Sequence, residues 1–264
     1  MELPSMQQER RRYLIDYLLG ENPTYRDIAV PADEGTQKKL LRSLMNVRWA
    51  APLDEEVLAV QDAYLGTVNA ERGIVTLADV EEREPGLCLW QGDITRLQVD
   101  AIVNAANSGM TGCYQPCHAC IDNCIHTYAG MQLRNFCAAI MEEQGHEEPT
   151  GQAKITPAYN LPCRYILHTV GPIVRGPLTE EHERLLASSY ESCLTLAEEN
   201  GCASIAFCCI STGVFMFPGR RAAEIAIDTV RAHRARTGSG IRVVFNVFLD
   251  EDRRIYEALL PVKE

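Results

Sequence analysis

The sequence has no long apolar run, no internal repeat and no low-complexity tract. No segment approaches the roughly 18 apolar residues that a membrane-spanning helix needs. A secretion signal would carry an apolar core after its first residues, but in this sequence charged residues soon follow residues 1–4. The eleven cysteines are an odd number, and without an export signal such thiols stay free or bind metal in a reducing compartment. We therefore expect a cytoplasmic protein that contacts no membrane.

Positive charge is also scarce. The chain has 25 lysines and arginines against 36 aspartates and glutamates, which gives a formal net charge of −11. A protein that coats a nucleic-acid backbone needs a basic stripe that releases counterions, and this sequence has none. The nearest candidate is the run of arginines at 10–12, which we expect to form a solvated face of a helix. We expect no nucleic-acid partner.

What the chain does contain is typical of a folded protein with a core, since 46% of its 264 residues are hydrophobic and 23% are charged. Apolar positions at helical spacing predict three early helices, over residues 6–20, 35–48 and 54–70. Asp54 is placed to cap the third helix. The acidic segment 79–86 ends in Pro-Gly and is typical of a connection. The sequence thus predicts a helical extension over residues 1–80 and a second domain over residues 86–264.

Beyond the connection, short β-branched segments alternate with helical ones. This alternation predicts an α/β fold in which a largely parallel sheet of six strands is covered by helices on both faces. Sheets of this kind bind ligands at the carboxyl ends of their strands. The expected strands cover 87–90, 99–103, 154–157, 165–170, 204–208 and 241–247, and the expected helices cover about 122–144, 180–200, 219–236 and 251–260.

Polar or glycine-rich loops follow three of these strands. Residues 92–95 (GDIT) follow the first, and Asn104 and Asn107 are expected just past the end of the second. Residues 210–218 (ISTGVFMFP) join a strand to a helix, and Gly213 would let main-chain N–H groups approach an anion such as a diphosphate. A plain turn is the alternative for this loop taken alone. Three such loops at one sheet edge favour a binding site.

The segment after Asn107 is dense in cysteine and histidine. Thiolate and imidazole at short spacing form the ligand set that zinc prefers, and Gly112 and Pro116 mark a loop in which packing alone does not call for such ligands. The seven cysteines outside residues 113–124 lie in apolar or helical surroundings, and we expect them to be buried, inert side chains. The candidate ligands are Cys113, Cys117, His118, Cys120 and Cys124.

Five ordered motifs together resemble the macrodomain family, an α/β module that binds ADP-ribose. More narrowly, the chain is similar to zinc-dependent macrodomains, which are protein-ADP-ribose hydrolases. The resemblance covers residues 86–262 and implies a three-layer macrodomain with a mixed, largely parallel sheet of six strands and an N-terminal all-helical extension. The motifs are GDIT at 92–95, DAIVNAANS at 100–108, CIDNCIH at 120–126, HTVGP at 168–172 and STGVFMFP at 211–218.

The resemblance also implies roles for individual residues. Asp93, with Ile94 beside it, would bind the adenine, and Phe248 would stack near its ring. Asn104 and Asn107 would hold the distal ribose, and Asp122 would act as a general base or orient the attacking group, as hydrolytic macrodomains carry an aspartate at this place. The diphosphate would be wrapped by Ser211, Thr212, Gly213, Val214 and Phe215.

The resemblance implies that Cys113, His118 and Cys120 are the zinc ligands. The fourth coordination position would stay open, as it does in catalytic zinc sites. Cys117 or Cys124 could close that position and make the zinc structural. We favour three ligands because Cys117 adjoins His118, and adjacent residues rarely reach one ion. For Asp122, the alternative to catalysis is a helix N-cap.

The remaining histidines carry weaker expectations. We expect His168 to bond main-chain atoms at the sheet edge, and His126, four residues after Asp122, is a candidate neighbour of the site. We expect His146, His182 and His233 to be solvent-exposed, because they lie in polar stretches.

These observations favour a zinc-dependent hydrolase that removes O-linked mono-ADP-ribose from protein side chains. A binding module that reads ADP-ribose without cleaving it is the alternative, as is an O-acetyl-ADP-ribose deacetylase. The expected partners are ADP-ribose and a mono-ADP-ribosylated protein, and we expect a monomer. The resemblance further suggests a sirtuin-like ADP-ribosyltransferase system and a lipoate-carrier target.

Overall fold

The computed structural model describes residues 6–261. Residues 1–5, in which we expected no secretion signal, and residues 262–264 lie outside the described residues. No helix within the described range is both long and apolar enough to cross a membrane.

The first part of the chain is helical, as the sequence predicts. The helices are α1 (Gln7–Glu21), α2 (Glu34–Val47) and α3 (Glu55–Glu71), with a short 3₁₀ turn, η1 (Pro23–Tyr25), between the first two. Their apolar faces meet in a hydrophobic cluster of their own, which Met131 of the later chain joins. Asp33 caps α2 through a hydrogen bond from the Thr36 N–H, whereas Asp54 occupies the cap position of α3 without such a bond.

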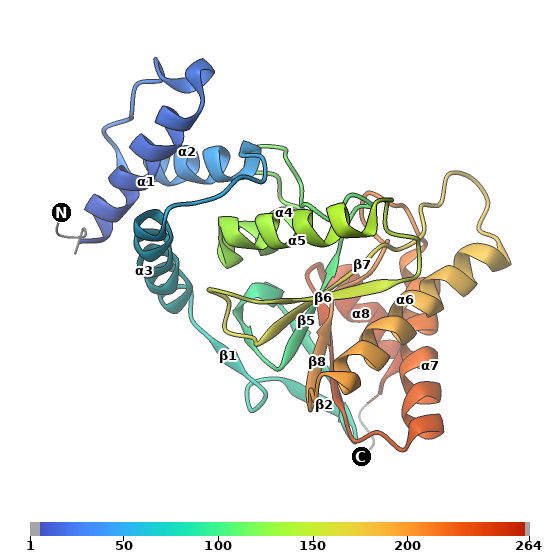
Figure 1. The fold of residues 1–264 in the computed structure, drawn as a ribbon. Coiled ribbons are helices and arrows are strands. Elements are labelled where there is room, and N and C mark those ends of the chain that lie inside the picture. The colour runs from blue at the N-terminus through green and yellow to red at the C-terminus, as the bar shows by residue number, and fades with distance from the viewer. Residues whose placement is uncertain (1–5, 262–264) are drawn as a thin grey trace.

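A seven-stranded mixed sheet forms the centre of the remaining chain (Figure 1). The strand order is β2-β3-β9-β8-β5-β7-β6, in which the five inner strands are parallel and both edge strands are antiparallel. A separate pair joins β1 (Val75–Thr76) to β4 (Leu97–Gln98). The strands of the large sheet are β2 (Glu81–Glu84), β3 (Leu87–Gln91), β5 (Ala101–Ala105), β6 (Ala153–Pro157), β7 (Tyr165–Thr169), β8 (Ser204–Phe207) and β9 (Arg242–Val247).

Helices cover both faces of this sheet. In Figure 1, α4 (Ile121–Ala129) and α5 (Met131–Gln144) lie on one side, and the last three helices lie on the other. The buried faces of the sheet and helices form the main hydrophobic core, which includes Ile102, Leu167 and Phe245. The helices on the second face are α6 (Glu180–Glu199), α7 (Gly219–Thr237) and α8 (Asp250–Leu259).

Four details of the fold differ from the sequence prediction. Strand β1 lies inside residues 1–80, which were predicted to be all-helical, because it pairs with β4. The sheet has a seventh strand, because part of the segment predicted as a connection pairs with β3 as strand β2. The helix predicted over 122–144 is two helices, since Gly130 adopts φ +109 between α4 and α5. Strand β5 continues to Ala105, so Asn104 lies within the strand instead of just past its end.

Two polar side chains predicted to face solvent are buried, because distant residues provide partners that no local pattern reveals. Arg11, with 3% of its surface exposed, donates hydrogen bonds to Gln37 and Glu34 of α2. His233 is 1% exposed, and its Nδ1 lies 3.0 Å from a carboxylate oxygen of Glu191. The arginine cluster is therefore only in part a solvated face.

Candidate functional site

The carboxyl ends of the parallel strands bring the predicted loops to one edge of the sheet. The main chain joins two pairs of loops directly. The Gly92 N–H donates to Val247 O at 2.9 Å, and the Ala106 N–H donates to Thr169 O at the same distance. The loops after β3 and β9 thus meet, as do those after β5 and β7.

A buried carboxylate lies at the centre of this edge. Asp122 is 5% exposed and accepts hydrogen bonds from Asn104 Nδ2 at 2.8 Å and Asn107 Nδ2 at 3.3 Å, one on each oxygen. The N-cap of α4 is Cys120, so Asp122 does not cap the helix. Burial raises the pKa of Asp122 to about 6, partly offset by the hydrogen bonds from the two asparagines and the nearby Arg134 charge. The structure therefore brings together the three residues predicted to act at the bond to be cleaved.

His168 fixes the orientation of Asn104 from the neighbouring strand. The two residues are paired in register on β7 and β5, and Asn104 Nδ2 lies 3.1 Å from His168 Nδ1. The other ring nitrogen lies 3.0 Å from Thr156 Oγ1. Burial lowers the pKa of His168 to about 3, so the ring is neutral, accepts from Asn104 and donates to Thr156. We expected main-chain partners for His168 at the sheet edge, but it bonds side chains inside the sheet.

Asn104 Oδ1 is left without a hydrogen-bond partner by this arrangement, although it is buried. Both hydrogens of the Asn104 amide are used, by Asp122 and by His168. Buried acceptors without partners are uncommon and costly. The free oxygen is therefore available to a donor on a bound ligand.

His126 lies beside Asp122 but does not pair with it. The 3.6 Å between His126 Nε2 and Asp122 Oδ1 exceeds hydrogen-bond reach. Burial lowers the pKa of His126 well below its usual range, so the ring carries no charge. With Cys137 and His168 it forms a buried cluster whose candidate ligand atoms lie within 4.8 Å of one another. Since both His168 nitrogens already have hydrogen-bond partners, we interpret this cluster as part of the packed core.

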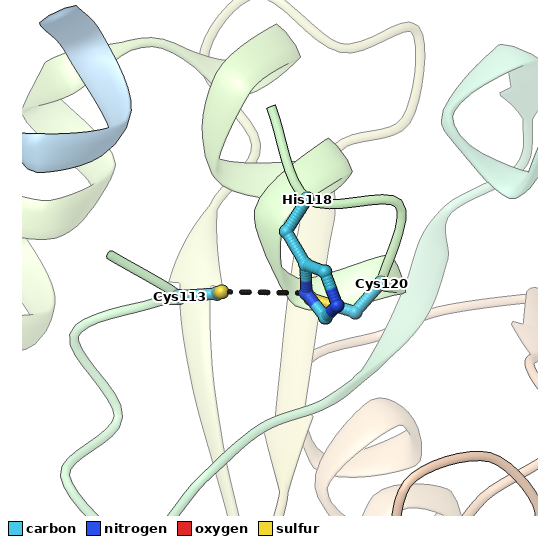
Figure 2. Close-up of side chains that lie close together, drawn as sticks. All are labelled: Cys113, His118 and Cys120. Carbon is cyan, nitrogen blue, oxygen red and sulfur yellow. Dashed lines mark hydrogen bonds between the residues drawn. The ribbon is translucent and has the colours of Figure 1, made fainter. Parts of the chain in front are cut away.

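The predicted metal ligands form a second cluster, at the start of α4. The side chains of Cys113, His118 and Cys120 point toward one another (Figure 2), and their ligand atoms lie within 4.8 Å of one another. Cys113 Sγ is 3.6 Å from His118 Nδ1. Two ligands of a tetrahedral zinc ion, at standard bond lengths, are separated by about 3.5 Å. The donor types and the spacing therefore fit a zinc ion.

Cys120 connects the two clusters, because it precedes Asp122 by two residues and caps α4. Its sulfur accepts a hydrogen bond from the Asn123 N–H at 3.4 Å. Burial raises the pKa of Cys120 to about 12, partly offset by that hydrogen bond. Without a nearby cation, Cys120 is a thiol, and a metal ion that binds here displaces its proton.

The two other candidate cysteines turn away from this cluster toward α2. Cys117 Sγ lies 3.2 Å from Ser43 Oγ, and Cys124 Sγ accepts from Arg42 Nη2 at 3.6 Å. Neither thiol belongs to the group of candidate ligands. The arrangement leaves three candidate ligands, the number that we favoured from the sequence.

Asp93 lies at the strand end nearest Phe248. Its Oδ1 accepts from the Thr95 N–H at 3.0 Å and the Thr95 hydroxyl at 2.6 Å. Its other oxygen pairs with Arg72, the residue that ends α3. Ile94 is 1% exposed with its side chain in the core, so only its main chain can meet a ligand. Phe248 is 71% exposed, which leaves its ring free to stack.

The predicted diphosphate loop follows β8 in a strained conformation. Ser211 has φ +65 and Met216 has φ +56, both in the left-handed region that disfavours side chains. Gly213 and Val214 are exposed, Thr212 and Phe215 partly buried, and Ser211 Oγ is buried without a partner. Cys117 and Met110, in the loop after β5, also have positive φ. Such strain gathers at functional sites.

Gly171 of the HTVGP motif explains how this loop packs. A Cβ at Gly171 would lie 2.1 Å from Ser211 Oγ and 2.7 Å from the Ile210 side chain. Real side chains do not approach so closely, so only glycine fits there. The motif after β7 thus brings the loop after β8 into place.

Sequence reasoning missed four side chains that hold the site: Arg42, Asn46, Arg72 and Arg134. Arg134 is 5% exposed and donates to Thr111 O at 2.7 Å and to Asn46 O at 2.9 Å. Within the site, the partners of Arg42, Asn46 and Arg72 lie 21 or more residues away, so nothing near these residues in the sequence indicates them. A basic residue within an apolar helical stretch, such as Arg134, is the one available signal.

The sheet, with Asn104, Asn107 and the buried Asp122 at its carboxyl edge, places the chain among the α/β folds that bind ligands at that edge, and comparisons with known proteins identify the family. A model of the macro domain matches residues 103–226. A protein-ADP-ribose hydrolase of Treponema medium is 61% identical over 258 residues, which cover 96% of this chain and 99% of the relative. The chain belongs to the macrodomain family.

Two further relatives extend this likeness. A protein-ADP-ribose hydrolase of Staphylococcus aureus (strain MSSA476) is 46% identical over 262 residues, covering 97% of each chain. The crystal structure of the Trypanosoma brucei macrodomain in complex with ADP-ribose superimposes with a TM-score of 0.65 at 30% identity, covering 83% of this chain and 94% of that one. The similarity to both hydrolases includes the N-terminal helices, because it spans nearly the whole chain.

Proposed function

We propose that this protein is a zinc-dependent hydrolase that removes O-linked mono-ADP-ribose from modified protein side chains. One observation carries the proposal. The first turn of α4 places the candidate metal ligand Cys120 two residues from the buried carboxylate of Asp122. Two relatives that span nearly the whole chain are named protein-ADP-ribose hydrolases.

ADP-ribose would lie along the carboxyl edge of the sheet. Asp93 would accept from the adenine amino group, the Ile94 main chain would lie beside the base, and the exposed Phe248 ring would stack on it. Main-chain N–H groups of residues 211–215 would contact the diphosphate next to α7, whose N-terminus adds positive potential. The distal ribose would then reach Asn104 and Asn107.

The chain's own residues supply the reaction geometry. In hydrolysis a water oxygen replaces the side-chain oxygen on the anomeric carbon of the distal ribose, and the leaving oxygen ends as a carboxylate or hydroxyl. Asp122 takes a proton from that water or orients it, while Asn104 and Asn107 hold the carboxylate in place. A zinc ion held by Cys113, His118 and Cys120 would polarise an oxygen bound beside it.

An ADP-ribose-binding module without catalysis would use the same pocket but would need no soft-ligand cluster beside it. An O-acetyl-ADP-ribose deacetylase would share both clusters, and it differs in the substrate it accepts. We further propose a cytoplasmic monomer that opposes a sirtuin-like transferase.

We expect the purified, metal-quantified protein to release ADP-ribose from a protein that carries single units on aspartate, glutamate or serine. Release should stop after chelation and return when zinc is added, because the donor set fits zinc. The assay is chromatographic detection of free ADP-ribose, with O-acetyl-ADP-ribose as a parallel substrate. Binding of ADP-ribose with no release from either substrate would establish a binding module instead.

Arg72 gives a separate prediction about adenine recognition. Its guanidinium pairs with Asp93, donates to Thr95 Oγ1 at 2.9 Å and lies 3.5 Å from the centre of the Tyr128 ring. We expect Arg72→Ala to weaken ADP-ribose binding about 5-fold, which is about 1 kcal/mol, because the Asp93 carboxylate loses the partner that orients it before the adenine binds. Calorimetry should show no such loss for the hypoxanthine analogue, which lacks the amino group. Tighter ADP-ribose binding would show that Arg72 competes with adenine.

A further inference from the structure

The helical extension contacts the metal-ligand loop through directed polar groups. We propose that α2 belongs to the site. Its Arg42 and Asn46 are positioning residues that hold the loop 113–120 in the conformation that brings Cys113, His118 and Cys120 together. This inference rests on the proposed zinc site. It gives the N-terminal helices a role beyond covering an apolar surface.

Arg42 anchors the loop at its histidine ligand. Its Nη2 donates to His118 O at 2.8 Å and to Asn123 Oδ1 at 2.8 Å. Asn123 is fully buried, and its own Nδ2 donates to Gln115 O at 2.9 Å and Cys113 O at 3.4 Å. One side chain of α2 therefore fixes the main chain of His118 directly and that of Cys113 through Asn123.

Asn46 anchors the residue next to the histidine. It is 2% exposed, and its Oδ1 accepts from the Cys117 N–H at 2.9 Å. Its Nδ2 donates to Thr127 Oγ1 of α4 at 2.9 Å, which fixes the orientation of the amide. Cys117 has φ +52, an unfavourable conformation for cysteine. The hydrogen bond from Cys117 to Asn46 helps to hold this strained residue in place.

Arg134 joins the C-terminal end of α2 to the same loop. Its guanidinium donates to Met45 O at 3.0 Å and Asn46 O at 2.9 Å, carbonyls of the last helical turn that lack helical partners. On the opposite side of the guanidinium, Nε donates to Thr111 O at 2.7 Å and Nη2 donates to Cys113 O at 3.4 Å. The C-terminal end of α2 is thus tied to the first metal ligand.

The loop itself offers little internal support. Residues 111–120, all of which the structure describes, form no helix or strand. Within the loop, the His118 N–H donates to Gln115 O at 3.3 Å. Partners that orient metal ligands through hydrogen bonds typically contribute 10–100-fold to metal affinity. Here α2 supplies many of those partners.

We would test this with Arg42→Ala and Asn46→Ala in the full chain, and with Lys38→Ala as the matched control. Lys38 is a half-exposed cation on α2 that pairs with Glu34 and does not touch the loop. Zinc affinity is measured by competition with a chromogenic chelator, ADP-ribose affinity by calorimetry, and folding by thermal unfolding. We expect each test variant to bind zinc about 10–100-fold more weakly. ADP-ribose affinity should stay within about 2-fold, and the control should match the unaltered protein.

Arg42→Lys keeps the inference testable if the alanine variant unfolds. The Arg42 hydrogen bonds to His118 of the loop and to Asn123 and Cys124 of α4 all use Nη2, so a single ammonium can replace part of them and should restore part of the zinc affinity. Normal zinc affinity in folded Arg42→Ala and Asn46→Ala would overturn the inference and leave the proposed function intact. An unaltered protein that binds no zinc would overturn both the metal assignment and this inference.

Discussion

We expect Asp122→Asn to lose most of its release of ADP-ribose while free ADP-ribose still binds. The amide keeps the size of the carboxylate in a site where only 5% of Asp122 is exposed, and its one oxygen can still accept from one of the two asparagines. It cannot take a proton, and general acid–base catalysis typically contributes 10²–10⁴-fold. We therefore expect kcat to fall at least about 100-fold. Single-turnover release measures the rate, and calorimetry measures the ADP-ribose affinity.

Two further variants separate catalysis from structure. Asp122→Ala removes the acceptor of two asparagine hydrogen bonds and should lose stability as well as turnover. Asp16→Asn changes a half-exposed carboxylate on α1 and should leave both unchanged. Turnover that survives in Asp122→Asn would show that Asp122 only positions the asparagines.

The sequence pattern was sufficient to predict which edge of the sheet carries the candidate site and which loops lie there. The apolar strand before Asn107, the motif at Asp93 and the loop after β8 all end on the same side, because parallel strands share their carboxyl edge. Ligand type and short spacing also predicted a metal-binding cluster within residues 113–124, and the family resemblance reduced its five candidates to Cys113, His118 and Cys120. Local patterns report local geometry well.

Long-range polar contacts could not be predicted in this way. Arg42 reaches His118, 76 residues on, and Arg72 reaches Asp93 from the end of α3. Nothing near either arginine differs from an ordinary solvated helix face. The position of Asn104 inside β5 was missed for the same reason, because it depends on pairing with the distant His168 of β7.

The two groups of residues also differ in what they do. The residues predicted from the motifs are those expected to meet ADP-ribose or metal directly. Of the missed residues, Arg42, Asn46 and Arg134 bond main-chain atoms of the loop 111–120, whereas Arg72 bonds the side chains of Asp93 and Thr95. Asn104 joins the two groups, because its amide bonds both Asp122 and the structural His168. The site is therefore built from short motifs that depend on distant polar supports.

Cys120→Ala should lose zinc and hydrolysis together. The substitution removes one of three candidate ligands, and we expect zinc affinity to fall at least about 100-fold, since outer partners alone cost 10–100-fold. Cys117→Ala is the matched control, because its thiol lies in the same loop but bonds Ser43 and belongs to no ligand group. It should keep zinc and activity. Elemental analysis measures the bound zinc, and release of ADP-ribose measures the activity. Loss of zinc in Cys117→Ala, with Cys120→Ala unaffected, would contradict the three-ligand site and move the metal toward α2.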